Sequence, residues 1–398
     1  MRPYDIVLFG ATGFTGRLTA EYLARAVPPN TNWALAGRDQ PKLEAVRERL
    51  PPPWADLPLL HADVTDPASL RELAASTRVI ATTVGPYNWY GEPLVAACTE
   101  AGTDYLDLAG EPEFVDRCYL RYHPRAVETG ARLVHSCGFD SIPPDLGAYF
   151  TVRHLPEGVP LRVRGFVRAA GTVSGGTYQS AIISFSRRRQ SAAVHRQRRR
   201  IEPRDAHRRA RAVRGRLHRD LDAHAWAVPL PTIDGSVVAR SARALDRYGP
   251  DFAYTHYAAV RRLRAVAGGI ATIAGVAALA QVPPVRRWLL RRVSSGAGPS
   301  PARRSRSWFT TRFVGEGGDQ RVVTEVAGGD PGYDETAKML AESALCLAFD
   351  RLPETRGQVT TATAMGDALI ARLTKAGMSF TVLDEPPSGP PTRRVLRT

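Results

Sequence analysis

The stretch that decides the fold is Val7-Leu8-Phe9-Gly10-Ala11-Thr12-Gly13-Phe14-Thr15-Gly16, near the start of a chain of 398 residues. Its apolar residues indicate a buried strand, its glycines indicate a turn, and the apolar spacing after it indicates a helix. The first glycine permits a tight turn, the second lets the backbone approach phosphate, and the third lets helix and strand pack closely. We therefore expect a dinucleotide pyrophosphate to be held by Gly10, Thr12, Gly13, Phe14, Thr15 and Gly16.

Arg38, which lies 22 residues after Gly16, bears on the choice of dinucleotide. It follows the apolar run 33–36, a second predicted strand, at the place where an NAD-binding protein usually carries Asp or Glu. An arginine there favours the 2′-phosphate of NADP. The alternative is a solvated residue at the entrance of the next helix, beside Asp39.

Short apolar runs alternate with helical patterns from residue 4 to about 137, which predicts a doubly wound parallel sheet. Ligands of such sheets bind at the carboxyl ends of the strands. Asp63 follows the third predicted strand and is either an acceptor for the adenine amino group or a simple turn residue. Gly85 and Pro86 open the aromatic loop after the fourth strand, which either flanks the nicotinamide or packs on a second domain.

The loop after the sixth predicted strand, 132–135, gathers several reactive side chains. It contains Ser136, Cys137 and Asp140, directly after His135. A thiol two residues after an imidazole suggests a protease dyad, but alternate residues of a strand and its exit rarely form one. We expect this loop to face the cofactor.

Four phrases carry a family resemblance: Gly10 to Gly16; Val84-Gly85-Pro86-Tyr87 with Tyr90-Gly91; Gly102-Thr103-Asp104-Tyr105 leading to Asp107 and Gly110-Glu111; and Gly138-Phe139-Asp140-Ser141-Ile142-Pro143. The sequence resembles the saccharopine dehydrogenase-like oxidoreductases, and within them the trans-acting enoyl reductases of bacteria that build polyketide-derived lipids. The resemblance implies an NADP-binding Rossmann domain with an inserted α+β domain, C-terminal helices that return to the first domain, and hydride transfer to a lipid-type substrate.

Enoyl reduction needs a donor for the enolate oxygen and an acid for the α-carbon. Tyr87 is the first choice because a phenol can serve either role, and Tyr90 and Asp140 are second choices; bound water is an equal alternative. Two other functions stay open, which are a saccharopine-type imine reductase acting on amino acids and a non-catalytic, membrane-associated nucleotide-binding protein.

The pattern predicts a nucleotide-binding domain over 1–150, a substrate or association domain over 151–330, C-terminal helices over 331–385 and a disordered tail over 386–398. Arginines crowd 187–219 without aromatic residues, which argues against nucleic acid. They form either a solvated helix face or a contact with anionic lipid or an acidic carrier protein.

Residues 265–285 contain no charged side chain and are flanked by arginines. We expect 261–292 to dock on a membrane or a hydrophobic groove; a core helix and a true span are the alternatives. The substrate is then a small molecule or lipid, with a carrier as an option, and a homodimer is plausible.

The net charge of +15 arises almost wholly from arginine, since only Lys42, Lys338 and Lys375 are lysines. Such a field attracts phosphate and other anions. The four cysteines have no metal-ligand spacing, which predicts reduced thiols and no metal site. The first apolar run is already the nucleotide strand, so we expect no signal peptide and a cytoplasmic protein, with the inner face of the plasma membrane as an option.

Overall fold

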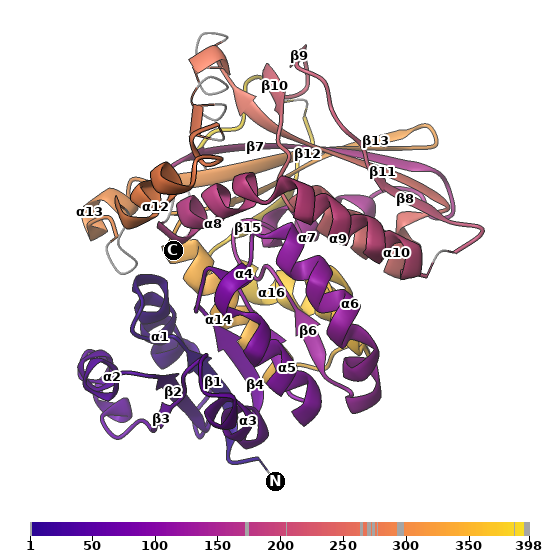
Figure 1. Cartoon of the computed structure of the whole chain (residues 1–398). Coiled ribbons are helices and arrows are strands. Elements are labelled where there is room, and N and C mark those ends of the chain that lie inside the picture. Colours follow the sequence, from indigo (N-terminus) through magenta and orange to yellow (C-terminus); the bar gives the residue numbers. More distant parts are fainter. Residues whose placement is uncertain are drawn as a thin grey trace.

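The computed structural model describes residues 2–171, 175–203, 205–262, 266–268, 272, 275–276, 278–292, 298–385 and 387–393. Its first sheet, in the lower half of Figure 1, has seven strands in the order β14-β6-β5-β4-β1-β2-β3, and neighbouring strands are parallel. The strands are β1 (Tyr4–Phe9), β2 (Trp33–Gly37), β3 (Leu59–His61), β4 (Thr77–Thr82), β5 (Asp104–Leu106), β6 (Arg132–Val134) and β14 (Gly357–Val359).

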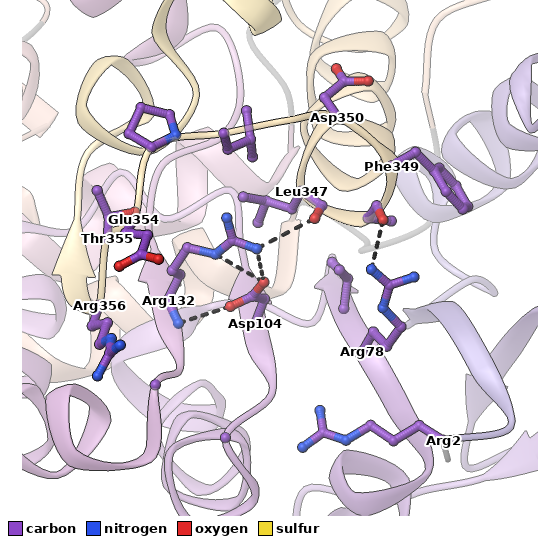
Figure 2. A pocket seen from close by; sticks show the side chains of 16 residues that line it. Arg2, Arg78, Asp104, Arg132, Leu347, Phe349, Asp350, Glu354, Thr355 and Arg356 are labelled. Carbon is purple, nitrogen blue, oxygen red and sulfur yellow. Dashed lines mark hydrogen bonds and ion pairs between the residues drawn. The ribbon is translucent and has the colours of Figure 1, made fainter.

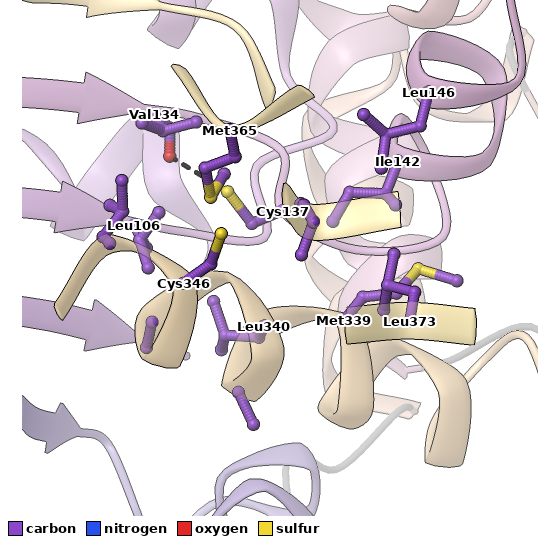
Figure 3. Packing of buried hydrophobic residues seen from close by; sticks show 14 of the residues in the cluster. Leu106, Val134, Cys137, Ile142, Leu146, Met339, Leu340, Cys346, Met365 and Leu373 are labelled. Carbon is purple, nitrogen blue, oxygen red and sulfur yellow. Dashed lines mark hydrogen bonds between the residues drawn. The ribbon is translucent and has the colours of Figure 1, made fainter. Parts of the chain in front are cut away.

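Helices cover both faces of this sheet, because its central strands are apolar on both sides. In β1, Ile6 and Leu8 pack in the cluster that contains residues of α1 and α14, whereas Val7 and Phe9 pack in the cluster with residues of α3, α5 and α6. Figure 3 shows α14 side chains against the strands. The helices are α1 (Phe14–Ala26), α2 (Gln40–Arg47), α3 (Pro67–Ser76), α4 (Tyr87–Tyr90), α5 (Glu92–Ala101), α6 (Pro112–Thr129) and α14 (Asp334–Phe349), with a 3-10 turn η1 (Pro52–Trp54).

The second sheet is mixed and has eight strands, in the upper half of Figure 1. β12 and β13 form an antiparallel hairpin, with pairing that runs from Phe309 opposite Gly328 to Gly317 opposite Gln320. The strands are β7 (Leu161–Ala170), β8 (Arg209–Ala212), β9 (His218–Asp220), β10 (Ala225–Pro229), β11 (Asp251–Val260), β12 (Trp308–Gly317), β13 (Gln320–Gly328) and β15 (Ser379–Val382).

α7 (Ile142–Val152) joins the two sheets. It packs directly on the second sheet, since a Cβ on its Gly147 would lie 2.3 Å from the ring of Phe313 on β12. The remaining helices are α8 (Gly175–Ser186), α9 (Arg188–Ile201), α10 (Asp234–Ala244), α12 (Pro283–Arg292), α13 (Pro301–Arg304), α15 (Thr361–Ala364) and α16 (Gly366–Lys375), with a 3-10 turn η2 (Asp246–Tyr248).

The predicted fold class is confirmed: a Rossmann-type parallel sheet carries an inserted second domain, and α14 returns to the first sheet. The prediction of a disordered tail over 386–398 is wrong for 387–393. The side chains of Arg168, Arg312 and Thr310 donate hydrogen bonds to the carbonyls of Pro391, Gly389 and Thr392, at 2.8, 2.8 and 2.6 Å. Residues 386 and 394–398 lie outside the described part.

Much of the 265–285 segment also lies outside the described residues. Among the helices that the structure describes, none combines the length and the apolar character needed to cross a membrane.

All four cysteines are buried and free, as expected for reduced thiols. Cys137 and Cys346 lie in the packing of Figure 3.

Candidate coenzyme and active site

The glycine turn after β1 is closed by contacts that only glycine permits. Gly10 has a φ of +89°, and its carbonyl accepts hydrogen bonds from the amide of Gly13 at 3.1 Å and from Thr83 Oγ1 at 2.9 Å. A Cβ on Gly16 would lie 2.2 Å from the Gly10 oxygen, and a Cβ on Gly10 would lie 2.7 Å from Val84 Cγ2. A side chain at either position therefore forces the turn open.

The turn leads straight into α1, whose first amides have no side-chain cap. Gly13 occupies the N-cap position, and the first turn contains no acidic residue. Thr12, Phe14 and Thr15 are half-buried around it. Unpaired amides and the positive end of the helix dipole suit a pyrophosphate, so these residues fit the group that the sequence predicts.

Arg38 and Asp63 come together at the ends of β2 and β3. Arg38 is exposed, while its neighbour Asp39 is engaged by Lys42 at 2.7 Å. Asp63 accepts hydrogen bonds from the amide and hydroxyl of Thr65, both at 2.8 Å. These bonds hold the pKa of Asp63 below its usual value, and the charge of Arg38 lowers it further. The two predicted cofactor residues therefore lie beside each other at the carboxyl ends of β2 and β3.

Tyr87 is buried beneath the carboxyl ends of the strands of the first sheet, and its side chain is not open to a ligand. Its hydroxyl donates to the Thr82 carbonyl at 3.0 Å and accepts from the Leu108 amide at 3.1 Å, so it ties the end of β4 to the loop after β5. Burial raises the pKa of Tyr87 well above its usual value. Tyr90 is 41% exposed on α4 and contacts Trp89 edge-on. This geometry favours a structural role for Tyr87.

Gly85 and Pro86 lie where β4 leads into α4. The Pro86 carbonyl accepts hydrogen bonds from the amides of Trp89 and Tyr90, both at 3.1 Å. Gly85 is exposed and Pro86 is buried. This segment begins next to the glycine turn, since Val84 contacts the Gly10 position.

Asp140 lies half-buried in the loop after β6. A Cβ on Gly110 would be 3.1 Å from its Oδ2, so the loops after β5 and β6 meet at this carboxyl group. Burial raises the pKa of Asp140. A carboxyl group in this state retains a proton closer to neutral pH than an exposed one.

Glu111, beside Gly110, is a second acid at this edge, which the sequence reasoning did not select. It is fully buried, and its carboxylate accepts hydrogen bonds from Ser180 Oγ at 2.5 Å and from the Asn88 amide at 2.9 Å. Burial raises the pKa of Glu111 to about 7. Its position in the loop between β5 and α6 was the available signal.

The helix α8 lies across this edge. At its start the amide of Gly175 is 3.4 Å from the hydroxyl of Tyr333, whose ring packs on Phe14 of the glycine turn. Further along, Ser180 meets Glu111. The helix therefore extends from the coenzyme turn to the buried acid.

His135 pairs with Asp107 and not with Cys137. Its Nδ1 lies 2.6 Å from Asp107 Oδ2. The Cys137 thiol donates to the Val134 carbonyl at 3.4 Å, and burial raises the pKa of that thiol well above its usual value. A Cys-His dyad is therefore absent at this loop.

A cavity of about 670 Å³ opens at the opposite, amino-terminal edge of the first sheet (Figure 2). Arg2, Arg78 and Arg132 lie in its wall, and Arg132 pairs with Asp104. It lies far from the carboxyl ends of the strands, where the coenzyme residues gather.

Among the described residues, no group of three or more His, Cys, Asp or Glu side chains could hold a metal ion.

Residues 6–134 match the family model of the saccharopine dehydrogenase NADP binding domain, which confirms the prediction of NADP as the cofactor. The yeast saccharopine dehydrogenase (L-Glu forming) from Saccharomyces cerevisiae superposes with a TM-score of 0.54 at 12% identity, over 96% of this chain and 100% of that one. That likeness shows the fold.

Two curated relatives are named as trans-acting enoyl reductases. One, from Mycobacterium tuberculosis strain H37Rv, is 40% identical over 409 residues, and one from Mycobacterium ulcerans strain Agy99 is 37% identical over 418 residues. Each alignment covers 95% of this chain and 97% of the relative. The chain belongs to the trans-acting enoyl reductase family.

Proposed function

We propose that this protein is an NADPH-dependent enoyl reductase that reduces a conjugated double bond in a polyketide-derived lipid intermediate. The names of its relatives and its NADP-binding domain support this function. The observation that carries the proposal within the chain is Asp140, an acid with a raised pKa at the strand ends that also bear the glycine turn.

The coenzyme supplies a hydride to the β-carbon of the substrate when it is bound. Gly10 to Gly16 would hold its pyrophosphate through backbone amides, and Arg38 would pair with its 2′-phosphate. Val84 and Gly85 follow β4, the strand next to β1, so they are the residues that would flank the nicotinamide end of a bound coenzyme.

Asn88 is our candidate for the donor that stabilises the enolate oxygen. Both polar atoms of its side chain are buried, and neither has a hydrogen-bond partner among the described residues. Its own backbone amide donates to Glu111 at 2.9 Å, which places it at the acid-bearing edge. A buried amide N–H aimed at a developing oxyanion typically contributes about 10²–10³-fold in turnover.

Asp140 is our candidate for the acid that protonates the α-carbon. Burial raises its pKa, so Asp140 keeps its proton to a higher pH than an exposed carboxyl group does, and the residue is partly exposed at the strand ends. Glu111, fully buried and bonded to Ser180, instead holds α8 over the edge and excludes water.

The segment 278–292 is our candidate for the surface that meets the lipid. Ala280 packs on Ile182 of α8, and Gln281 donates to the Phe185 carbonyl at 2.8 Å. Leu279 and Trp288 of the segment are exposed. Apolar residues here, flanked by arginines, suit an anionic lipid surface or an acyl chain close to the active edge.

The test measures NADPH oxidation at 340 nm with an enoyl thioester, and separately with keto acid plus amino acid. We expect turnover only with the enoyl substrate, and a fall of about 10²–10⁴-fold in Asp140→Asn with unchanged NADPH affinity. Asp319→Asn, in the exposed β12–β13 turn, is the matched control. Turnover with keto acid and amine would instead support an imine reductase.

A further inference from the structure

A second cavity, of about 210 Å³, lies beside the first sheet at the ends of β6 and β14. Helices α6, α9 and α10 close it, and all three lie on the right of Figure 1. Apolar side chains line it together with charged and polar ones; the lining includes Val115, Tyr119, Val237, Val359, His135, Arg198, Glu202, Arg240 and Arg243. None of these residues takes part in the coenzyme or proton-transfer roles described above.

His135 presents an unused polar atom to this cavity. The side chain is 5% exposed, and its Nε2 is buried with no hydrogen-bond partner among the described residues. Asp107 accepts hydrogen bonds from the amides of Ala109 and Ser136, at 2.9 and 2.8 Å, and its Oδ2 lies 2.6 Å from Nδ1 of His135, so Nδ1 already has a partner. His135 is part of the cavity lining, so its Nε2 resonance can report whether the cavity is occupied.

Positive charge exceeds negative charge around the cavity in the part of the chain that the structure describes. Asp116 forms ion pairs with Arg198, at 3.1 Å, and with Arg240. Glu202 forms ion pairs with Arg198, at 3.0 Å, and with Arg243, at 2.7 Å. Three guanidinium groups thus share two carboxylates. His195 also contacts Asp116, at 2.9 Å, which adds no negative charge.

Arg240 is the arginine most affected by this shortage of negative charge. Burial, together with the nearby charge of Arg198, lowers the pKa of Arg240 to about 10. A buried cation that shares its counter-ion with another cation is poorly compensated. An anion in the cavity would restore the balance.

We propose that this cavity is a binding site for a small organic anion, a monocarboxylate about the size of benzoate, with its carboxylate at Arg240 and its apolar body against Val115, Val237 and Val359. A cavity of about 150 Å³ is known to hold benzene, so 210 Å³ has room for roughly eight to ten non-hydrogen atoms. The apolar walls exclude inorganic phosphate as the preferred ligand, and the arginine excludes a neutral molecule.

The test is calorimetric titration of the full chain, saturated with NADPH, with benzoate, with its neutral isostere benzamide and with phosphate. We expect saturable benzoate binding, at least tenfold weaker benzamide binding and weaker phosphate binding. In ¹⁵N-histidine-labelled protein, benzoate should shift the His135 Nε2 resonance.

Arg240→Met should weaken benzoate binding at least tenfold and leave NADPH affinity unchanged. The pairs Asp116–Arg198 and Glu202–Arg243 remain in this variant, so we expect it to fold. Val237→Phe, which fills the cavity without changing charge, is a second variant. Arg196→Met, exposed on α9 and outside the lining, is the matched control.

Three results would overturn the proposal. If benzoate does not bind, the cavity is not an anion site. If Arg240→Met or Val237→Phe binds benzoate as tightly as the wild type does, benzoate binds elsewhere. Equal affinity for benzamide or phosphate shows that the ligand class is wrong. None of these results depends on enoyl reductase activity.

Discussion

Arg38→Ala should convert an NADPH-preferring protein into one with little preference. The Arg38 side chain is exposed at the end of β2, and the neighbouring carboxylate Asp39 is occupied by Lys42. Charge-assisted hydrogen bonds to the 2′-phosphate contribute about 1.5–3 kcal/mol, which corresponds to roughly a 10- to 150-fold rise in the NADPH dissociation constant. Because the side chain is exposed, solvent screening places the effect toward the lower figure.

The assay is a titration of nicotinamide fluorescence with NADPH and with NADH. NADH lacks the 2′-phosphate, so its dissociation constant should change by less than about twofold, which is a few tenths of a kcal/mol. Lys42→Ala removes a nearby exposed cation and serves as the control. The NADPH advantage should also shrink as ionic strength rises.

Equal weakening of both nucleotides in Arg38→Ala would refute the reasoning, since it would mean that the residue supports the fold rather than the phosphate. No effect on either nucleotide would assign the 2′-phosphate contact to another residue. A loss of NADPH binding in Lys42→Ala equal to that in Arg38→Ala would point to a general charge effect.

Three further predictions concern residues at the carboxyl ends of the strands of the first sheet. Gly16→Ala should lower the melting temperature and abolish NADPH binding because its Cβ would lie 2.2 Å from the Gly10 oxygen, whereas Gly13→Ala, at 3.5 Å from that atom, should keep the fold in a thermal melt. The pKa of Glu111 is about 7 in the folded protein and about 4.5 in the unfolded chain. Its ionisation therefore costs about 3 kcal/mol of stability, a cost that is absent below pH 4 and fully present above pH 7. Urea unfolding should therefore show Glu111→Gln gaining on the wild type as pH rises from 4 to 8; parallel curves would contradict the raised pKa. Asn88→Ala should lower turnover with the enoyl thioester about 10²–10³-fold without changing NADPH affinity, and full activity would exclude its role as the oxyanion donor.

The glycine turn and its strands could be predicted because their signals are local. An apolar run followed by Gly10, Gly13 and Gly16 determines strand, turn and helix without reference to distant residues. The β12–β13 hairpin is local in the same sense, because its two strands are adjacent in sequence. β14, in contrast, is a three-residue strand containing Gln358, and it joins the first sheet only through its distant partner β6.

The acids at the active edge could be identified only in part. Asp140 was named from its place after a strand, but Glu111 precedes Pro112 and has the sequence pattern of a helix N-terminus. Its raised pKa arises from burial beside Ser180, which is 69 residues away in the chain. Tyr87 was favoured because a phenol can donate a proton, and sequence could not show that two backbone groups already occupy its hydroxyl.

His135 and Arg240 illustrate the same limit for the second cavity. The partner of His135 is Asp107, 28 residues earlier, and that of Arg240 is Asp116, 124 residues earlier. The sequence places each of them in an unremarkable strand or helix. Only the packing of α9 and α10 against α6 reveals the shared carboxylate and the excess of positive charge.

The most direct test of enoyl reduction is the fate of deuterium from 4-deuterated NADPH in a single turnover with an enoyl thioester. The account predicts that mass spectrometry and NMR of the product find deuterium at the β-carbon, and that solvent deuterium appears at the α-carbon in the wild type. Transfer to a carbon that bears nitrogen, or no transfer despite tight NADPH binding, would contradict it.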